Sequence, residues 1–224
     1  MDINERMKNA LERTELIRPP RQHLATFGNT VLSYYVVTGL ADGVTVVRDG
    51  NVIAERPRIV TPSYLVNLEG FSQKARTYFS DIARGHPDDP GIFYKYKNEA
   101  KKMNVVSEPL KQVISNLDAR LEEEKNPLSA IIKGVEEFWD VSLVMFIYHL
   151  TSSSVSSNVA EFSSRGLLTM DNSGVPGEAR QHIEELFEMV GLDISKASAL
   201  VSELNRWGLF NEYQDRFFAM FRSK

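Results

Sequence analysis

The pattern of apolar residues changes once along this chain, and that change restricts the fold more than any other feature. Between residues 30 and 56, β-branched and aromatic residues form three runs of strand length. After Pro109, apolar residues instead recur every three or four positions, which is the spacing of helices packed on one side. The two blocks predict an α+β fold in which a small antiparallel meander with a packed helix precedes a mainly α-helical region.

Turn signals divide the strand-like block. Asp42-Gly43 and Asp49-Gly50 lie between the runs, and Asp-Gly pairs favour hairpins because glycine tolerates positive φ. We therefore expect a three-stranded meander over residues 30–56. A helix should begin at Thr61-Pro62, where a capping hydroxyl precedes a first-turn proline, and pack across the sheet. Residues 92–97 should add a fourth strand.

The segments around these strands are expected to be helical. Ile3, Met7, Leu11 and Leu16 give an N-terminal helix an apolar side, and Pro19-Pro20 should end it. The predicted later helices cover residues 110–121, 126–139, 141–150, 151–166, 178–190, 195–207 and a final one after residue 210. Since the 141–150 run is apolar on nearly all sides, we expect it in the centre of the core. These elements predict an α+β region over 1–107 and a helical region over 108–224.

Residues 184–210 contain two predicted helices separated by a glycine. Gly191 is expected to make the turn, and the second helix should bury Leu200 and Leu204. Gly208 should end that helix, after which the chain returns to the core. Helix, glycine turn and second helix together resemble a helix-turn-helix of the winged-helix kind.

The resemblance implies that the outward face of the second helix contacts DNA, with Asn and Arg reading bases and Ser and Lys holding phosphates. The candidate contact residues are Lys196, Ser198, Ser202, Asn205 and Arg206, and the same face should present Glu203. Charge opposes DNA binding, because residues 178–224 hold six basic and eight acidic side chains. The alternative is a contact with a protein partner or a second copy of the chain, since a fold does not fix a function.

A shift of 42 residues aligns part of the chain with itself. It places residues 149–168 on residues 191–210 with seven identities in twenty positions. The match predicts tandem helix-turn-helix-like units at 141–168 and 184–210. The alternative is that two amphipathic helices ending in Gly-Leu match by chance, and His149 in place of the turn glycine favours that alternative.

A second candidate surface combines aromatic and basic residues. In a strand, Lys95 and Lys97 would share one face and Tyr94 and Tyr96 the other. Arg56 and Arg58 would extend the cationic surface over the same sheet. Such a patch suits a phosphate-bearing ligand or a single-stranded nucleic acid. The alternative is a solvated edge strand that its lysines protect from aggregation.

Signals of enzymatic chemistry are weak. The chain has no cysteine, its four histidines show no metal-ligand spacing, and it has no glycine-rich phosphate loop. His149 fits a hydrogen-bonded core or turn histidine better than a catalyst. We therefore expect no catalytic residues, no metal and no cofactor.

The composition is that of a globular protein outside the membrane. The longest apolar run, 141–150, is too short to span a bilayer, so we expect a cytoplasmic protein. The net charge of −4 is not that of a dedicated nucleic-acid binder. The sequence favours a non-enzymatic binding or regulatory protein. A nucleic-acid-binding regulator, a protein-interaction or assembly module, and an enzyme with an unseen site all remain open.

Overall fold

Two compact units make up the chain, and each is built from two separate stretches of sequence. The computed structural model describes residues 3–66, 84 and 89–222. The first unit contains residues 1–57 and 94–158, and the second contains residues 58–93 and 159–224. The predicted boundary at residue 107 differs from this division, because strands from both sides of that residue belong to the same sheet.

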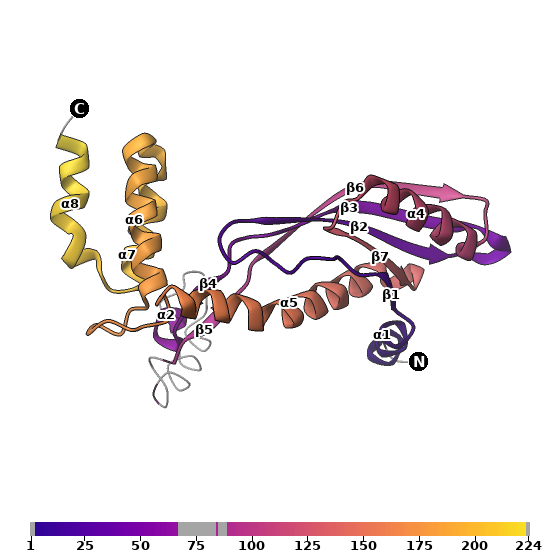
Figure 1. Ribbon diagram of the computed structural model, residues 1–224, viewed down its shortest axis with the longest axis horizontal. Coiled ribbons are helices and arrows are strands. Elements are labelled where there is room, and N and C mark those ends of the chain that lie inside the picture. Colours follow the sequence, from indigo (N-terminus) through magenta and orange to yellow (C-terminus); the bar gives the residue numbers. More distant parts are fainter. Residues whose placement is uncertain (1–2, 67–83, 85–88, 223–224) are drawn as a thin grey trace. The chain divides into compact units, whose positions relative to one another are not determined.

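Unit 1 is a five-stranded sheet with helices on both faces (Figure 1). Its elements are α1 (Ile3–Glu12), β1 (Glu15–Arg18), β2 (Thr30–Gly39), β3 (Thr45–Ala54), β6 (Tyr96–Val106), α4 (Leu110–Glu124), β7 (Ser129–Gly134) and the greater part of α5 (Trp139–Ser164). The strand order is β1-β7-β2-β3-β6, and only β2 and β7 run parallel. This confirms the predicted α+β class, with a mixed sheet in place of a purely antiparallel meander.

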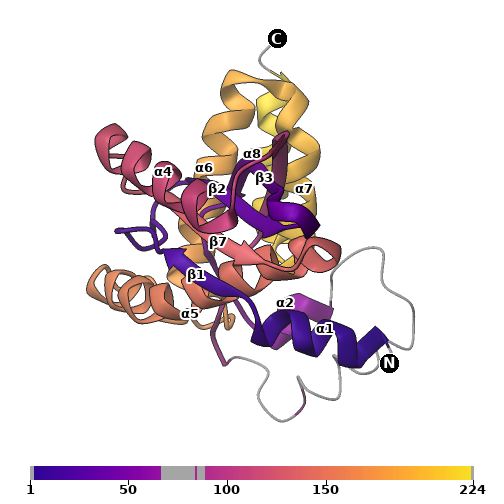
Figure 2. The same cartoon turned by 90° about the vertical axis from the view of Figure 1, so that its right-hand side faces the viewer.

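The two faces of the sheet carry different helices, and Figure 2 shows α4 and α5 on opposite sides of β1 and β7. On one face, buried Tyr34 and Val36 of β2 pack with Phe146 of α5. On the other face, Val37 of β2 packs with Leu117 of α4. Because successive side chains of a strand point to opposite faces, β2 is buried on both sides and forms the centre of the unit.

The hairpin predicted at Asp42-Gly43 is confirmed. A short 3-10 turn joins β2 to β3 there, and both residues have positive φ, 60° and 73°. The turn predicted at Asp49-Gly50 is wrong. This pair lies inside β3, where the register with β6 shifts at a β-bulge. The third strand of the meander is therefore β6 rather than residues 51–55.

Residues 126–139 were expected to form a helix, and this prediction is also wrong. They contain strand β7 and a short 3-10 turn, Glu136–Phe138. Three consecutive residues of β7, Ala130, Ile131 and Ile132, are fully buried because both faces of the strand are covered. A strand buried on both faces has no polar alternation, so its apolar run cannot be told from a buried helix by periodicity.

The N-terminal helix is shorter than predicted. α1 ends at Glu12, and Leu16, expected on the helix, lies on β1 at the edge of the sheet. β1 pairs antiparallel with β7, with an irregularity in register between Leu16 and Arg18. The strand thus gains its hydrogen bonds from a partner far along the chain, which local periodicity does not reveal.

The predicted internal repeat fails because α5 is one continuous helix from Trp139 to Ser164. His149, placed at the turn of the first copy, lies within the helix and is exposed. Residues 141–168 are therefore not a helix-turn-helix unit. Val144 and Tyr148, expected in the core, are 64% and 67% exposed, because only one side of α5 packs on the sheet.

Unit 2 combines a small sheet with helices. Its elements are β4 (Arg58–Val60), α2 (Pro62–Val66), β5 (Gly91–Phe93), α6 (Gly177–Leu192), α7 (Ala197–Arg206) and α8 (Phe210–Arg222). β4 and β5 pair antiparallel, so the predicted strand 92–97 is divided between β5 and β6. The predicted cap is confirmed, since the backbone N–H of Tyr64 donates to Thr61 Oγ1 at 3.3 Å. The apolar residues expected further along this helix, from Leu68 to Ile82, lie outside the described residues.

The helices α6, α7 and α8 enclose a core of their own. Leu200 and Leu204 are fully buried in it, and Gly208 has a φ of 69° where α7 ends, as expected. The turn is displaced from Gly191, because α6 continues through Leu192. The Asp193 carboxylate then accepts a hydrogen bond from the backbone of Ser195. After α7 the described chain enters α8, a helix in the position where a winged helix has its β-hairpin.

Candidate functional site

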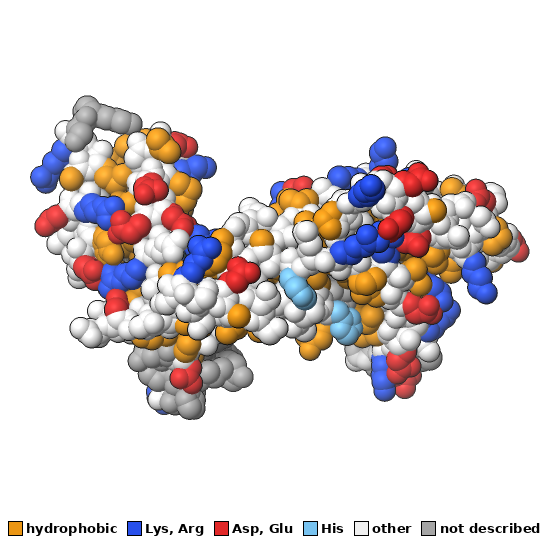
Figure 3. Space-filling model, viewed as in Figure 1, with side chains coloured by type: hydrophobic (Ala, Val, Ile, Leu, Met, Phe, Trp, Pro, Cys, Tyr) orange, Lys and Arg blue, Asp and Glu red, His pale blue; other side chains and the backbone are white. Residues whose placement is uncertain are grey.

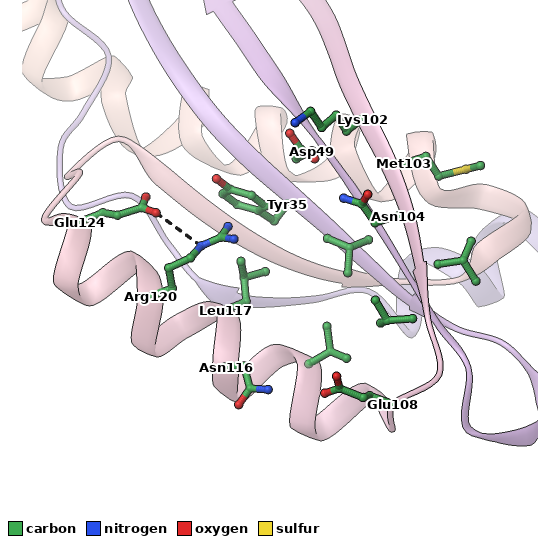
Figure 4. Close-up of a pocket in the computed structure, with 14 residues that line it drawn as sticks. Tyr35, Asp49, Lys102, Met103, Asn104, Glu108, Asn116, Leu117, Arg120 and Glu124 are labelled. Carbon is green, nitrogen blue, oxygen red and sulfur yellow. Dashed lines mark ion pairs between the residues drawn. The ribbon is translucent and has the colours of Figure 1, made fainter.

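An open groove of about 890 Å³ lies between α4 and the β3–β6 half of the sheet (Figure 4). It exists because α4 packs on β2 and β7 and leaves the adjoining strands uncovered on that face. Its volume falls in the range of binding pockets. We call this space the α4–β6 groove.

The groove has an apolar base and polar surroundings. Tyr35 and Val47 of the sheet and Leu117 of α4 supply apolar surface. The Arg120 guanidinium lies 5.4 Å from the centre of the Tyr35 ring and 3.4 Å from the Glu124 carboxylate. The remaining polar residues are Asp49, Lys102, Asn104, Glu108 and Asn116. Because both signs of charge are present, the groove suits a mixed polar and apolar chain better than a simple anion.

Strand β6 borders the groove with an unpaired edge. In the described part of the chain, its only neighbouring strand is β3. The first part of β6 carries Lys97, Lys101 and Lys102, and lysines on an edge discourage unspecific strand pairing. Residues 103–106 carry no charge. Their outward backbone N–H and C=O groups are therefore accessible to an added strand.

The side chains at this end of β6 alternate between two surfaces. Asn104 lines the groove, as Figure 4 shows. Met103 and Val105 also border the groove, but strand alternation places their side chains on the face opposite Asn104, where they are 62% and 59% exposed. An added strand would consequently meet apolar side chains on one face and the groove on the other.

The sequence does not predict this groove, because its residues come from β2, β3, β6 and α4, and their proximity depends on the register of the sheet. One local signal was present. The lysine-rich segment of β6 is followed by the uncharged run Met-Asn-Val-Val, a combination typical of an edge strand whose end is left unprotected.

The tyrosines of the predicted anionic-ligand patch are engaged with α5. The Tyr94 and Tyr96 rings stack with centroids 6.5 Å apart, and both pack against the core. Tyr94 donates to Asn158 Oδ1 at 2.7 Å, and the Tyr96 and Thr151 hydroxyls are 2.5 Å apart. Burial, together with neighbouring Tyr96, raises the pKa of Tyr94 to about 12. Both tyrosines thus help to attach β6 to α5, which limits the ring faces available for stacking.

The basic residues of that patch in unit 1 lie close to acidic or aromatic partners. Lys95 pairs with Glu55 at 2.8 Å and Lys97 with Glu99 at 2.7 Å. The Arg56 guanidinium lies over the Phe27 ring. The lysines are exposed and the tyrosines are half-buried, which is the alternation expected of a strand. These pairings favour the alternative of a protected edge strand over a phosphate site.

Arg58, the remaining member of the predicted patch, is buried in unit 2. Its guanidinium contacts the carboxylates of Glu178 at 2.9 Å and Glu203 at 2.8 Å, and both carboxylates are nearly inaccessible to solvent. Tyr64 and the Trp207 indole also donate to Glu203. Burial opposes ionisation of Glu203, but attraction to Arg58 outweighs it and holds the pKa of this carboxyl below its usual value. Arg58 therefore compensates buried charge instead of extending a cationic surface.

The residues predicted to contact DNA differ in exposure. Three of them are exposed, namely Lys196, Ser198 and Asn205. Ser202 and Arg206 are half-buried, and Arg206 lies 3.5 Å from the Glu203 carboxylate. Glu203, expected on the outward face, is buried instead, and it is the only acidic residue of α7. The exposed face of α7 thus carries no carboxylate.

The histidines show no catalytic arrangement within the described ranges. His23 and His149 line a smaller hollow of about 380 Å³ on unit 1, next to Phe146 and Leu150. His149, expected in the core or a turn, is exposed on α5, at the flank of the helix that borders this hollow. In the same ranges, no three histidine or carboxylate side chains come together as a metal site would require.

Comparison with known proteins gives no match to a family model, to a curated protein sequence or to a solved structure. Within the described residues, none of the helices combines the length and apolar character needed to cross a bilayer. Functional inference therefore depends on the surfaces themselves, of which the α4–β6 groove has the most complete set of binding features.

Proposed function

We propose that this protein is a protein-interaction module that binds an extended segment of a partner protein beside β6. The observation that carries the proposal is the uncharged, unpaired end of β6, residues 103–106, next to the α4–β6 groove. Strand addition to a sheet edge gains affinity from main-chain hydrogen bonds and specificity from alternate side chains. The chain has both features at one place.

The partner segment is defined by the two surfaces it would meet. Side chains on one face would pack on Met103 and Val105, so they should be apolar. Those on the other face would enter the groove, where Asn104, Asn116 and the Arg120 guanidinium offer hydrogen bonds. The expected ligand is a short strand that alternates apolar with polar or acidic residues.

Val105→Lys should weaken binding of such a segment by at least about tenfold, or about 1.4 kcal/mol. The lysine removes apolar contact and places a charge on the edge, while the exposed position lets the protein fold normally. Displayed random peptides of about ten residues, the length of one strand, would be selected on the whole protein. Their affinities for wild type and variant are then compared by titration.

A matched control separates this edge from general surface effects. Val31→Lys introduces the same charge at another exposed valine, on β2, and should leave peptide affinity unchanged. Hydrogen exchange of the complex should slow at the amides of residues 103–106. Peptides that bind Val105→Lys as tightly as wild type, or that protect amides elsewhere, would contradict the proposal.

DNA binding by α7 is a second candidate, and burial of Glu203 supports it. The sequence argument against DNA rested on acidic residues, and the one in α7 is neutralised by Arg58. Lys196, Ser198 and Asn205 are then exposed on or next to α7, whose exposed residues include no carboxylate. Such a face is compatible with a phosphate backbone, although α6 and α8 keep their acidic residues.

Binding to mixed-sequence duplex DNA at low salt tests this second candidate. If α7 contacts the backbone, Lys196→Ala should weaken binding uniformly and reduce the slope of affinity against salt by about one. If Asn205 contacts base edges, Asn205→Ala should weaken binding only to particular DNA sequences. Lys111→Ala, a lysine on α4 in the other unit, is the control. Absence of binding at low salt would remove DNA from consideration.

A further inference from the structure

We infer that α5 carries a self-association surface on which a second copy of the chain docks with its own α5 antiparallel. The surface, called here the outer stripe, consists of Val144, Tyr148, Ser152, Val155 and Val159. This inference is independent of the proposed function, because the stripe and the α4–β6 groove involve different elements.

The outer stripe lies opposite the packed side of α5. Leu143, Phe146 and Leu150 are buried against the sheet. The stripe residues follow one another at intervals of three or four, so they share the other side of the helix. Its four large members are between 37% and 67% exposed. A contiguous apolar surface of this kind on a soluble helix marks an interaction site more often than isolated exposed residues do.

The stripe also lacks the charges that a solvated helix normally presents. No Asp, Glu, Lys or Arg occurs in residues 141–160. Figure 3 shows few charged side chains over this part of α5 in its view. Residues 141–150 of α5 are apolar on nearly all sides, and a helix of this kind is typically buried on all of them. The sheet covers one side of α5, so the outer side is expected to be covered by a partner.

The order of residues along the stripe indicates which partner this is. It is nearly palindromic about the midpoint between Thr151 and Ser152. Val144 and Val159 are equally far from that midpoint, and so are Tyr148 and Val155. In a two-fold symmetric contact, residue i meets residue j and j meets i. An antiparallel pair of α5 helices would therefore pack valine on valine at both ends and tyrosine on valine further in.

The centre of the stripe suits close approach of two helices. Ser152 is small, exposed and next to the two-fold axis, whereas the larger side chains lie on either side of it. A surface without charges cannot select a partner by charge complementarity. When two copies of it meet, however, no like charges face each other, so self-association is not opposed by repulsion. Since one helix pair buries a small area, we expect a reversible dimer whose fraction rises with protein concentration.

The cysteine-free sequence allows a direct test of this geometry. Ser152→Cys places its thiol at the two-fold axis, so oxidation or a short thiol cross-linker should join two copies. Val144→Cys should not cross-link to itself, because its two copies would lie roughly 22 Å apart along the helices. A mixture of Val144→Cys and Val159→Cys chains should cross-link. All three reactions use the otherwise unchanged full chain.

Sedimentation equilibrium gives an independent readout without cysteines. Wild type should show a monomer–dimer equilibrium, and Tyr148→Glu should abolish the dimer because it buries a carboxylate twice. His149→Glu, the neighbouring exposed residue outside the stripe, should leave the dimer intact. Circular dichroism of both variants verifies that they fold.

Three results would overturn the inference. Wild type that stays monomeric at every concentration shows that nothing of this chain covers the stripe. Val144→Cys that cross-links to itself as readily as Ser152→Cys shows a parallel pair. A dimer that survives Tyr148→Glu but is lost in Val105→Lys places self-association at β6.

Discussion

Arg58→Ala is expected to destabilise unit 2 by about 3–5 kcal/mol, the usual cost of removing one partner from a buried ion pair. Arg58 is the guanidinium between Glu178 and Glu203, and both carboxylates are excluded from solvent. Without the arginine, the buried Glu178 and Glu203 carboxylates lose the guanidinium N–H groups that donate hydrogen bonds to both of them. The change therefore leaves charge uncompensated, which costs more than the lost contact itself.

Tryptophan fluorescence during urea unfolding can measure this loss in the affected unit. The chain has two tryptophans, and Trp207 touches the cluster while Trp139 lies in unit 1. In a Trp139→Phe background, the emission reports unit 2. Arg216→Ala, which removes an exposed pair with Glu184 and a guanidinium contact 4.0 Å from the centre of the Phe187 ring, is the control and should cost clearly less, on the order of 1 kcal/mol. Equal losses for the two arginines would refute the argument.

The same cluster predicts how the stability of unit 2 depends on pH. The folded-state pKa of Glu203 lies below its ordinary value of 4.5, because Arg58 outweighs the effect of burial. A depressed carboxyl pKa contributes stability that is present above the unfolded pKa and is lost as pH falls through the folded one. Acidification below about pH 4.5 should lower the unfolding free energy of wild type more steeply than that of Arg58→Ala.

Gly50→Ala should destabilise unit 1 by about 1–3 kcal/mol, the typical cost of forcing an extra group into a packed site. A Cβ at this position would lie 2.5 Å from the Tyr34 hydroxyl oxygen and 2.7 Å from the backbone carbonyl oxygen of Glu99. Tyr34 is buried and its hydroxyl donates to Asn98, and the Glu99 carbonyl belongs to paired strand β6, so neither neighbour can shift cheaply. Glycine is therefore required here by close approach at the bulge, since its φ is not positive.

Gly39→Ala in the same hairpin is a matched control. Its added Cβ would meet only a Leu110 methyl carbon at 3.7 Å, an ordinary contact, so its effect should be small. Urea unfolding followed by Trp139 fluorescence in a Trp207→Phe background compares the two. Adding Tyr34→Phe to Gly50→Ala should recover only part of the loss, because it removes the hydroxyl but leaves the ring carbon Cζ and the Glu99 carbonyl oxygen, both 2.7 Å from the added Cβ. Equal stability of the two alanine variants would contradict the steric explanation.

Local signals in the sequence were sufficient where the structure is decided locally. The Asp42-Gly43 turn, the Thr61 cap and the burial of Leu200 and Leu204 each depend on a few adjacent residues, and all are confirmed. Gly208 likewise ends α7 through its own positive φ. Capping, turn and helical-face signals are reliable because their physical causes act within one or two turns of the chain.

Long-range contacts decided the features that were missed. Asp49-Gly50 has the composition of a turn, but pairing with β6 on one side and β2 on the other keeps it in a strand. The helical spacing of α7 predicts that Glu203 is exposed, but its carboxylate is buried in an ion pair with Arg58. The α4–β6 groove depends on which strands α4 leaves uncovered. No local pattern encodes these partners, because each is chosen by residues distant in sequence.

The interleaving of the two units governs the order in which the chain can fold as it is synthesised. β7 lies between β1 and β2 in the sheet but follows both in the sequence, so β1 has no partner until residues 129–134 have emerged from the ribosome. In unit 2, Arg58 is made long before Glu178 and Glu203. The β2–β3 hairpin can form early, but its β2 edge stays open to other chains until late in synthesis. A chain truncated before residue 129 would keep that edge permanently and should aggregate.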